Sequence, residues 1–379
     1  MSIIADTAII AAHGAFDKRA GSGYNGGNGL GSGKNMQRLP EGLKEKLCAW
    51  YDAGHRDLPW RQDREPYHVW LSEIMLQQTR VEAVKGYYAR FLTELPTIAA
   101  LADCPPDRLT KLWEGLGYYS RVRNLQKAAK IIMEESGGVF PKTYDAVRAL
   151  PGIGDYTAGA ICSICFELPT SAVDGNVLRV LSRVMEDGAS ITAQQTKNAY
   201  REALLPLYEQ LPRGKLTQAL MELGAMVCVP NGAPRCGDCP LKELCLANAH
   251  GTWEAYPVKD AKKQKREEEK TVFYLICEDC LAVRKRPGKG LLAGLWELPN
   301  VEGKMDAGQA LCYVEDAGCE PTELLKSVER VHVFTHIIWR MRCYYMVCRR
   351  KSPEFVWADA QRRRADVALP TAFRMFVEE

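Results

Sequence analysis

The residues with the clearest chemical potential lie between Leu150 and Arg179, in the stretch LPGIGDYTAGAICSICFELPTSAVDGNVLR. Gly152 and Gly154 predict a turn before an apolar helix, where the backbone can approach a ligand closely and the first helical amides can hold a phosphate. Asp174 then adds one carboxylate close to that anchored backbone. A bound nucleic acid facing a single placed carboxylate indicates chemistry on a sugar–base bond. Asp174 also precedes NVLRVLSR, so a helix N-cap is an alternative role, and the two roles can coexist.

Four cysteines form a second group with chemical meaning. Cys228, Cys236, Cys239 and Cys245 fall within eighteen residues, in a segment rich in proline and glycine that can fold around a metal. Four thiolates at such spacing suit either a tetrahedral zinc ion or a 4Fe–4S cluster, and the spacing alone leaves both open. The pair Cys277 and Cys280 has no second pair and lies in a predicted hairpin, so we expect no metal there.

Composition sets the limits for the elements that must position these groups. A chain of 379 residues predicts two or three domains. The net charge is only +3, so any surface for nucleic acid must be a local patch. Fourteen cysteines, mostly scattered, indicate a reducing compartment. With no run long enough for a membrane span and no secretory signal pattern, we expect an intracellular protein of the bacterial cytoplasm or nucleoid.

The periodicity of apolar residues divides the chain into parts. Residues 1–38 predict a Gly-rich flexible tail, and residues 39–252 show helical spacing without sustained alternation. A polar, mixed-charge linker is expected at 253–270. Residues 271–379 predict an α+β domain, with a strand–turn–strand at 271–286, a helix near 306–317 and one long β segment at 331–350.

Several motifs together resemble a known family. The segments are WLSEIMLQQTRVEAV, WEGLGYYSRVRNL, LPGIGDYTAGA and VDGNVLRVLSR, accompanied by the four-cysteine loop. They are similar to the helix-hairpin-helix DNA glycosylase superfamily, in its iron–sulfur branch, and within it to the MutY family of adenine DNA glycosylases. The resemblance runs from about Leu39 to Asn248 and continues more weakly beyond. One departure is that seven residues, not the usual six, separate the first two cluster cysteines.

The resemblance implies an architecture. An all-α helix-hairpin-helix glycosylase domain would contain a six-helix, barrel-like part at 61–164 and a cluster part at 39–60 and 165–252. The cofactor would be a 4Fe–4S cluster held by the four cysteines. A degenerate Nudix (MutT-like) domain would follow at 271–379, because GLLAGLWELPN precedes a helical stretch. That stretch keeps only Glu315 and Asp316 of the acidic series that a Nudix hydrolase needs, so we expect no such activity.

The resemblance also implies the catalytic residues. Glu73 would be the general acid that protonates adenine at N7, because its apolar surroundings raise the pKa of a carboxyl group. A solvated glutamate on a polar helix face is the alternative. Asp174 would stay ionised and stabilise the sugar cation. Tyr156 stands where related glycosylases that also cut the strand carry a lysine, so we expect hydrolysis by water; a packing role is the alternative.

Further residues would contact the DNA. The resemblance assigns insertion into the gap left by the extruded base, or contact with neighbouring bases, to Gln77, Gln78 and Tyr118. It assigns other contacts to Trp60, Arg61, Asn176, Gly152 and Gly154. For Tyr118 an aromatic core position is the alternative. Gln218 stands where the family often has glutamate, and we assign it no role. Recognition of 8-oxoguanine would fall to Phe334, Thr335 and His336, with an ordinary strand as the alternative.

These observations predict a monofunctional base excision repair enzyme. It would act as a monomer on double-stranded DNA, would not associate with membranes, and would hydrolyse the N-glycosidic bond of adenine paired with 8-oxoguanine, and also with guanine. One alternative is an endonuclease III-like glycosylase and lyase for oxidised pyrimidines, which a lysine at position 156 would have favoured. The other is a lesion-binding protein without catalysis, in which Glu73 and Asp174 are structural.

Overall fold

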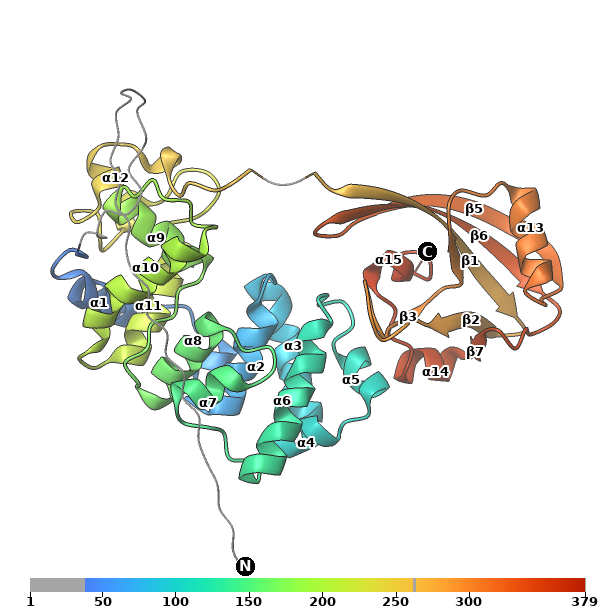
Figure 1. The fold of residues 1–379 in the computed structure, drawn as a ribbon, viewed down its shortest axis with the longest axis horizontal. Coiled ribbons are helices and arrows are strands. Elements are labelled where there is room, and N and C mark those ends of the chain that lie inside the picture. Colours follow the sequence, from blue (N-terminus) through green and yellow to red (C-terminus); the bar gives the residue numbers. More distant parts are fainter. Residues whose placement is uncertain (1–37, 262–263, 379) are drawn as a thin grey trace, which may run out of the picture. The chain divides into compact units, whose positions relative to one another are not determined.

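The computed structural model describes residues 38–261 and 264–378, so the expected Gly-rich tail lies outside the described residues except for Arg38. Between Arg38 and Asp260 the chain forms helices and loops, and no described residue there belongs to a strand, which confirms the predicted all-α part (Figure 1). The helices are α1 (Leu43–Gly54), α2 (Pro66–Leu76), α3 (Val81–Glu94), α4 (Ile98–Asp103), α5 (Pro106–Leu112), α6 (Ser120–Ser136), α7 (Tyr144–Ala149), α8 (Asp155–Phe166), α9 (Gly175–Met185), α10 (Gln194–Leu204), α11 (Arg213–Met226) and α12 (Leu246–Ala249). Short 3-10 turns are η1 (Pro59–Arg61), η2 (Leu205–Tyr208), η3 (Cys236–Asp238) and η4 (Trp253–Ala255).

Local sequence signals explain where several helices begin. Proline opens α2 at Pro66 and α5 at Pro106, where the missing amide hydrogen costs nothing. Thr97 and Thr143 cap α4 and α7, because each side chain accepts a hydrogen bond from the amide three residues later. One buried apolar core joins α2, α6 and α8, and Trp70 of α2 packs edge-on against Phe140 in it. That core fixes α2 and α8 against each other.

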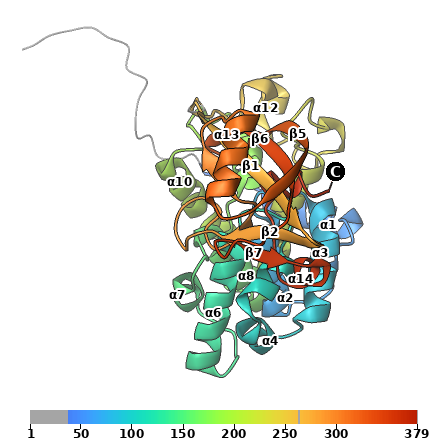
Figure 2. The same cartoon turned by 90° about the vertical axis from the view of Figure 1, so that its right-hand side faces the viewer.

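The C-terminal part is a mixed sheet with helices on both faces. Its strands are β1 (Arg266–Cys277), β2 (Cys280–Lys285), β3 (Trp296–Glu297), β4 (Asn300–Glu302), β5 (Pro321–Val333), β6 (Ile337–Cys348) and β7 (Val356–Ala358). They follow the order β3-β2-β1-β6-β5, with β4 beside β1 and β7 beside β2, and the β1–β6 pair is parallel. Helix α13 (Ala307–Asp316) packs on one face (Figure 2), while α15 (Thr371–Arg374) packs on the other; α14 (Ala360–Ala365) follows β7.

Two sequence-based boundaries were wrong. Strand β1 begins at Arg266, inside the range 253–270 that was expected as linker. The sequence did not reveal this start because the first residues of β1 are charged and mostly exposed. The single β segment expected at 331–350 is instead the end of β5 and all of β6, separated by a turn at 334–336. Strand β5 starts ten residues earlier than expected, at Pro321. It is an edge strand whose side chains are mostly exposed, so its sequence carries no alternating pattern.

Candidate active site

Helix α2 places Glu73 in the interior of the helical part. Apart from Ser72, its nearest neighbours on the helix are apolar, and Glu73 itself is only 7% exposed. Helix α8 packs against α2 and brings the Tyr156 hydroxyl to Glu73, where it donates a 2.7 Å hydrogen bond to Oε2. Glu73 is therefore a buried carboxyl group, and the alternative of a solvated glutamate is wrong.

Asp174 lies at the start of α9 and caps it. Its Oδ1 accepts hydrogen bonds from the amides of Asn176 and Val177 at 2.9 and 2.8 Å, and its Oδ2 accepts one from Asn176 Nδ2 at 2.7 Å. The N-cap alternative is confirmed. A carboxylate suits this site because it meets three N–H donors and the positive end of the helix dipole.

Burial raises the pKa of both carboxyl groups. For Glu73, loss of solvent is the largest cause and the charge of Asp174 adds to it, while Tyr156 and Arg61 oppose it, and the pKa rises to about 7. Burial also raises the pKa of Asp174, and its three N–H partners oppose that rise. Burial raises the pKa of Tyr156 far above its usual range, so its phenol stays a hydrogen-bond donor. Two carboxyl groups with different partners can thus hold different protonation states.

The turn before α8 differs at its two glycines. Gly152 has φ +82, and a Cβ there would lie 2.8 Å from Asn124 Cβ, so glycine is needed for both conformation and space. Gly154 is the N-cap of α8 with an extended backbone (φ −94), and a Cβ there would meet nothing within 4 Å. Only Gly152 therefore needs the backbone freedom of glycine, whereas Gly154 borders open space at a helix N-terminus.

A cavity of about 840 Å³ joins the two carboxyl groups, and we call it the Glu73 cavity. The residues expected from sequence that line it are Trp60, Arg61, Glu73, Gln77, Gln78, Gly154, Tyr156, Asp174 and Asn176. Those expected at the site that do not line it are Gly152, Tyr118, Phe334, Thr335 and His336. The residues that line it although the sequence analysis assigned them no role include Arg56, Lys197, Gln218, Met221 and Ala225. Its size is within the usual range for small-ligand pockets.

Arg121 organises the loops at the edge of this cavity and was missed from the sequence. It is buried, and its guanidinium donates to the carbonyls of Ile74, Met75, Gln77, Leu116 and Gly117 and to Thr79 Oγ1, at 2.6 to 3.2 Å. It also lies 5.5 Å from the Tyr118 ring centroid. Gln78 and Tyr118, with φ +56 and +48, belong to the two loops that Arg121 joins. Tyr118 is 46% exposed, so the alternative of a core aromatic is wrong for it.

The four clustered cysteines line a second cavity, together with Arg183 and Trp253. Arg183 Nη1 donates to Cys228 Sγ at 3.3 Å, and the Cys245 thiol donates to the Arg183 carbonyl at 3.5 Å. Among the described residues, no three His, Cys, Asp or Glu side chains converge on a point where one metal ion could sit. The four cysteines, which lie apart in the sequence, therefore border one common space.

The remaining predicted residues lie in the C-terminal sheet. Phe334, Thr335 and His336 form the turn between β5 and β6, so the ordinary-strand alternative is wrong. The Phe334 ring packs edge-on against Trp339 with ring centroids 4.8 Å apart, while Thr335 and His336 are exposed. Cys277 and Cys280 face each other where β1 and β2 join, as expected for a hairpin. None of the helices in the described ranges is both long and apolar enough to cross a membrane.

Comparisons with known proteins agree with this geometry. Residues 71–206 match the model of the HhH-GPD superfamily base excision DNA repair proteins, and residues 271–379 match that of the NUDIX domain. The chain is 33% identical to an adenine DNA glycosylase of Rattus norvegicus, with 89% of this chain and 78% of that protein covered. It is 35% identical to one of Homo sapiens, covering 82% and 68%, and 37% identical to one of Buchnera aphidicola subsp. Baizongia pistaciae, covering 67% and 72%.

Proposed function

The chain belongs to the adenine DNA glycosylase family, and from this premise we propose that it hydrolyses the N-glycosidic bond of adenine paired with 8-oxoguanine, and also of adenine paired with guanine. The observation that carries the proposal is that Glu73 and Asp174, a buried and a half-buried carboxyl group with different hydrogen-bond partners, line one cavity. Such a pair is what an oxocarbenium-like transition state requires: one group that gives a proton and one that stays negative. The substrate is double-stranded DNA, bound by a monomer in a reducing compartment.

The reaction follows from the roles of the two groups. Glu73 donates its proton to N7 of the extruded adenine, and the bond between N9 and the sugar breaks with its electron pair moving into the base. The sugar is left as a cation, which the carboxylate of Asp174 stabilises. Water adds to the sugar carbon and passes a proton to the carboxylate of Glu73, which restores the acid, and the products are free adenine and an abasic site. Tyr156 keeps Glu73 in place through its 2.7 Å hydrogen bond.

Tyr156 supports hydrolysis without strand cleavage. A phenol cannot form the Schiff base through which a lyase acts, and its hydroxyl is engaged with Glu73. Lys197 also lines the Glu73 cavity, so borohydride trapping on DNA should compare the wild type with Lys197→Ala. Efficient trapping that depends on Lys197 would contradict monofunctional hydrolysis.

Preference for the lesion is assigned to the turn at Phe334, Thr335 and His336. The Thr335 hydroxyl can both donate and accept a hydrogen bond, which suits a base that differs from guanine by an N7–H donor and a C8 carbonyl. Thr335 and His336 are both exposed, while Phe334 packs on Trp339 and fixes the turn.

Single-turnover adenine release tests the proposed function. We expect release from duplexes with adenine opposite 8-oxoguanine or guanine, faster opposite 8-oxoguanine, and none from adenine opposite thymine. Thr335→Ala should reduce the ratio of the two release rates, opposite 8-oxoguanine and opposite guanine, by about tenfold, which corresponds to one or two lost hydrogen bonds. Thr335→Ser is the control, because it keeps the hydroxyl. Release of an oxidised pyrimidine instead of adenine would contradict the proposal.

The cofactor proposed for the second cavity is a 4Fe–4S cluster held by Cys228, Cys236, Cys239 and Cys245. When bound, the cluster would fix the loop that follows α11, and it takes no part in the proton transfer at Glu73. Purified protein should contain about four iron atoms per chain and absorb broadly in the visible range. Cys239→Ser should lose most of the iron, whereas Cys280→Ser, at the hairpin, should keep it. Stoichiometric zinc without iron would contradict this assignment.

A further inference from the structure

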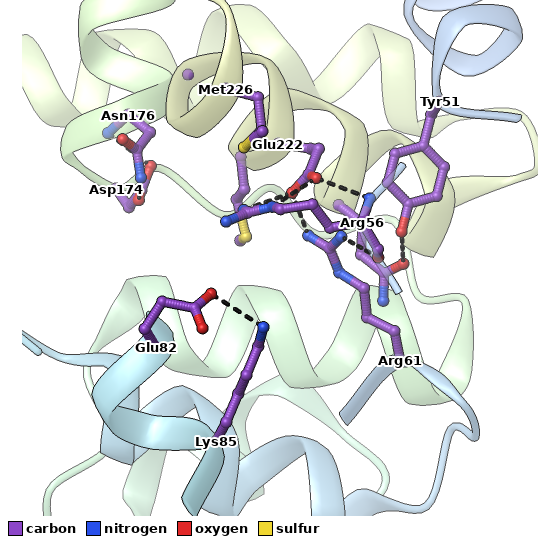
Figure 3. Close-up of polar contacts among 12 residues, drawn as sticks. Tyr51, Arg56, Arg61, Glu82, Lys85, Asp174, Asn176, Glu222 and Met226 are labelled. Atoms are coloured by element: carbon purple, nitrogen blue, oxygen red, sulfur yellow. Dashed lines mark hydrogen bonds and ion pairs between the residues drawn. The ribbon is translucent and has the colours of Figure 1, made fainter. Parts of the chain in front are cut away.

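Glu222 is a buried charge next to the Glu73 cavity that the proposed mechanism does not use. It lies on α11 and is 1% exposed. Its Oε1 accepts hydrogen bonds from Arg56 N and Nε at 3.0 and 2.8 Å, and its Oε2 accepts from Arg56 Nη2 and Arg61 Nη2 at 2.7 and 2.8 Å. Figure 3 shows this carboxylate between the two guanidinium groups. One buried anion thus holds two cations.

The position of this group relates it to the cavity. Arg56 and Arg61 line the Glu73 cavity, as do Gln218, Met221 and Ala225 of α11, whereas Glu222 does not line it. Glu222 therefore lies behind the arginines and would contact neither the base nor the sugar. Arg61 Nη1 also donates to the Arg56 carbonyl at 3.3 Å, and its guanidinium carbon lies 5.6 Å from the Tyr51 ring centroid. The arginine side chains are held from several sides at the cavity wall.

The charge of Glu222 is permanent at working pH. Burial alone would raise the pKa of this carboxyl group, but the hydrogen bonds from Arg56 and Arg61 outweigh burial and lower it to about 2. Removing Glu222 would leave the charges of Arg56 and Arg61 uncompensated. The loss of Glu222 should therefore affect groups beyond these two arginines.

The electrostatic consequence falls on Glu73. The groups that face it are Tyr156 and Cys165 from α8, Asp174 at the start of α9, and Arg61 from η1. Arg61 favours the ionised form of Glu73, which is the wrong form for a general acid. A negative charge 2.8 Å from Arg61 Nη2 offsets that effect.

We propose that Glu222 is a positioning residue: it fixes Arg56 and Arg61 at the wall of the Glu73 cavity, and its charge prevents Arg61 from drawing the proton off Glu73. The inference rests on the proposed function, because it concerns the general acid of that reaction. It identifies a residue that acts on catalysis through two arginines without touching the substrate.

The test is the pH dependence of single-turnover adenine release in Glu222→Gln. Above the pKa of Glu73 the rate of adenine release should fall as pH rises, and we call this part of the rate–pH profile the alkaline limb. Without the charge of Glu222, we expect the alkaline limb to move to lower pH by about one unit, which lowers the rate about tenfold at any pH on that limb. The rate below the limb should change much less. Glu222→Asp keeps the negative charge, so its alkaline limb should lie between that of the wild type and that of Glu222→Gln. Glu82→Gln is the matched control, because Glu82 is an exposed partner of Lys85 on α3, drawn in Figure 3.

A double variant separates charge from structure. Replacing both Arg61 and Glu222 with glutamine removes the cation together with its counter-ion, so the limb should return toward its wild-type position even if the rate is low. A folded Glu222→Gln enzyme whose limb stays in place, or a Glu222→Asp enzyme whose limb moves as far as that of Glu222→Gln, would overturn the inference alone. A wild type that releases no adenine from any mispair would overturn the proposed function, and this inference with it.

Discussion

Glu73→Gln should lower the single-turnover rate of adenine release by about 10²–10⁴-fold near pH 7, the range that a positioned general acid contributes. Glutamine has the shape of glutamic acid but no proton of suitable acidity, so the leaving adenine would depart without protonation. The new amide can still accept the hydrogen bond from Tyr156, so the buried site should remain filled and paired. The effect should therefore appear in the rate and not in the fold.

The measurement combines rate, binding and stability. Release is followed under single turnover with enzyme in excess, and the affinity for a duplex containing the mispair is measured on the same preparation. We expect duplex affinity within about threefold of wild type and a midpoint of denaturant unfolding that is nearly unchanged. A Glu73→Gln enzyme that keeps its full rate would show that another group supplies the proton.

Asp174→Asn should produce the second large loss, about 10²–10³-fold in the rate of release, comparable to the loss of one electrostatic contact to a developing charge. Asparagine is as good an N-cap as aspartate, so its Oδ1 can still accept from the amides of Asn176 and Val177. The free energy of unfolding should fall by no more than about 1 kcal/mol. A large rate loss with a small stability loss would separate the catalytic role of this residue from its structural one.

Asp306→Asn is the matched control for that experiment. Asp306 caps α13 in the C-terminal sheet domain, and its side chain accepts from Gln309 N at 2.9 Å. The substitution makes the same chemical change at another N-cap, and it should leave the rate of adenine release unaltered. If Asp174→Asn lost only as much activity as Asp306→Asn, then Asp174 would be a cap and nothing more.

Residues whose chemistry is local could be predicted from the sequence. The N-cap role of Asp174 follows from the residues that come directly after it, and the burial of Glu73 follows from the apolar run around it. Gly152 was expected at a turn that needs its conformation, and its φ of +82 agrees. In each case the decisive neighbours lie within a few positions along the chain, so a short window of sequence contains the signal.

Residues that depend on distant partners could not be predicted. Glu222 meets Arg56 and Arg61 from 166 and 161 positions away, and Arg121 bonds carbonyls 44 to 47 positions earlier. A buried glutamate or arginine has the same letter as a surface one, and only the tertiary fold shows which carbonyl or cation it meets. Most of edge strand β5 was not predicted either. Most of its side chains are exposed, so its sequence lacks the alternation of apolar and polar residues that marks a strand.

The central claim, that a buried and protonated Glu73 supplies the proton, is tested most directly by the pH profile of single-turnover adenine release by the wild type. Since burial raises the pKa of Glu73 to about 7, the group is protonated below that pH and loses its proton above it. We therefore expect a rate that levels off on the acid side of about pH 7 and falls by about tenfold per pH unit on the alkaline side. A rate that stays constant or rises from about pH 6 to pH 9 would contradict it.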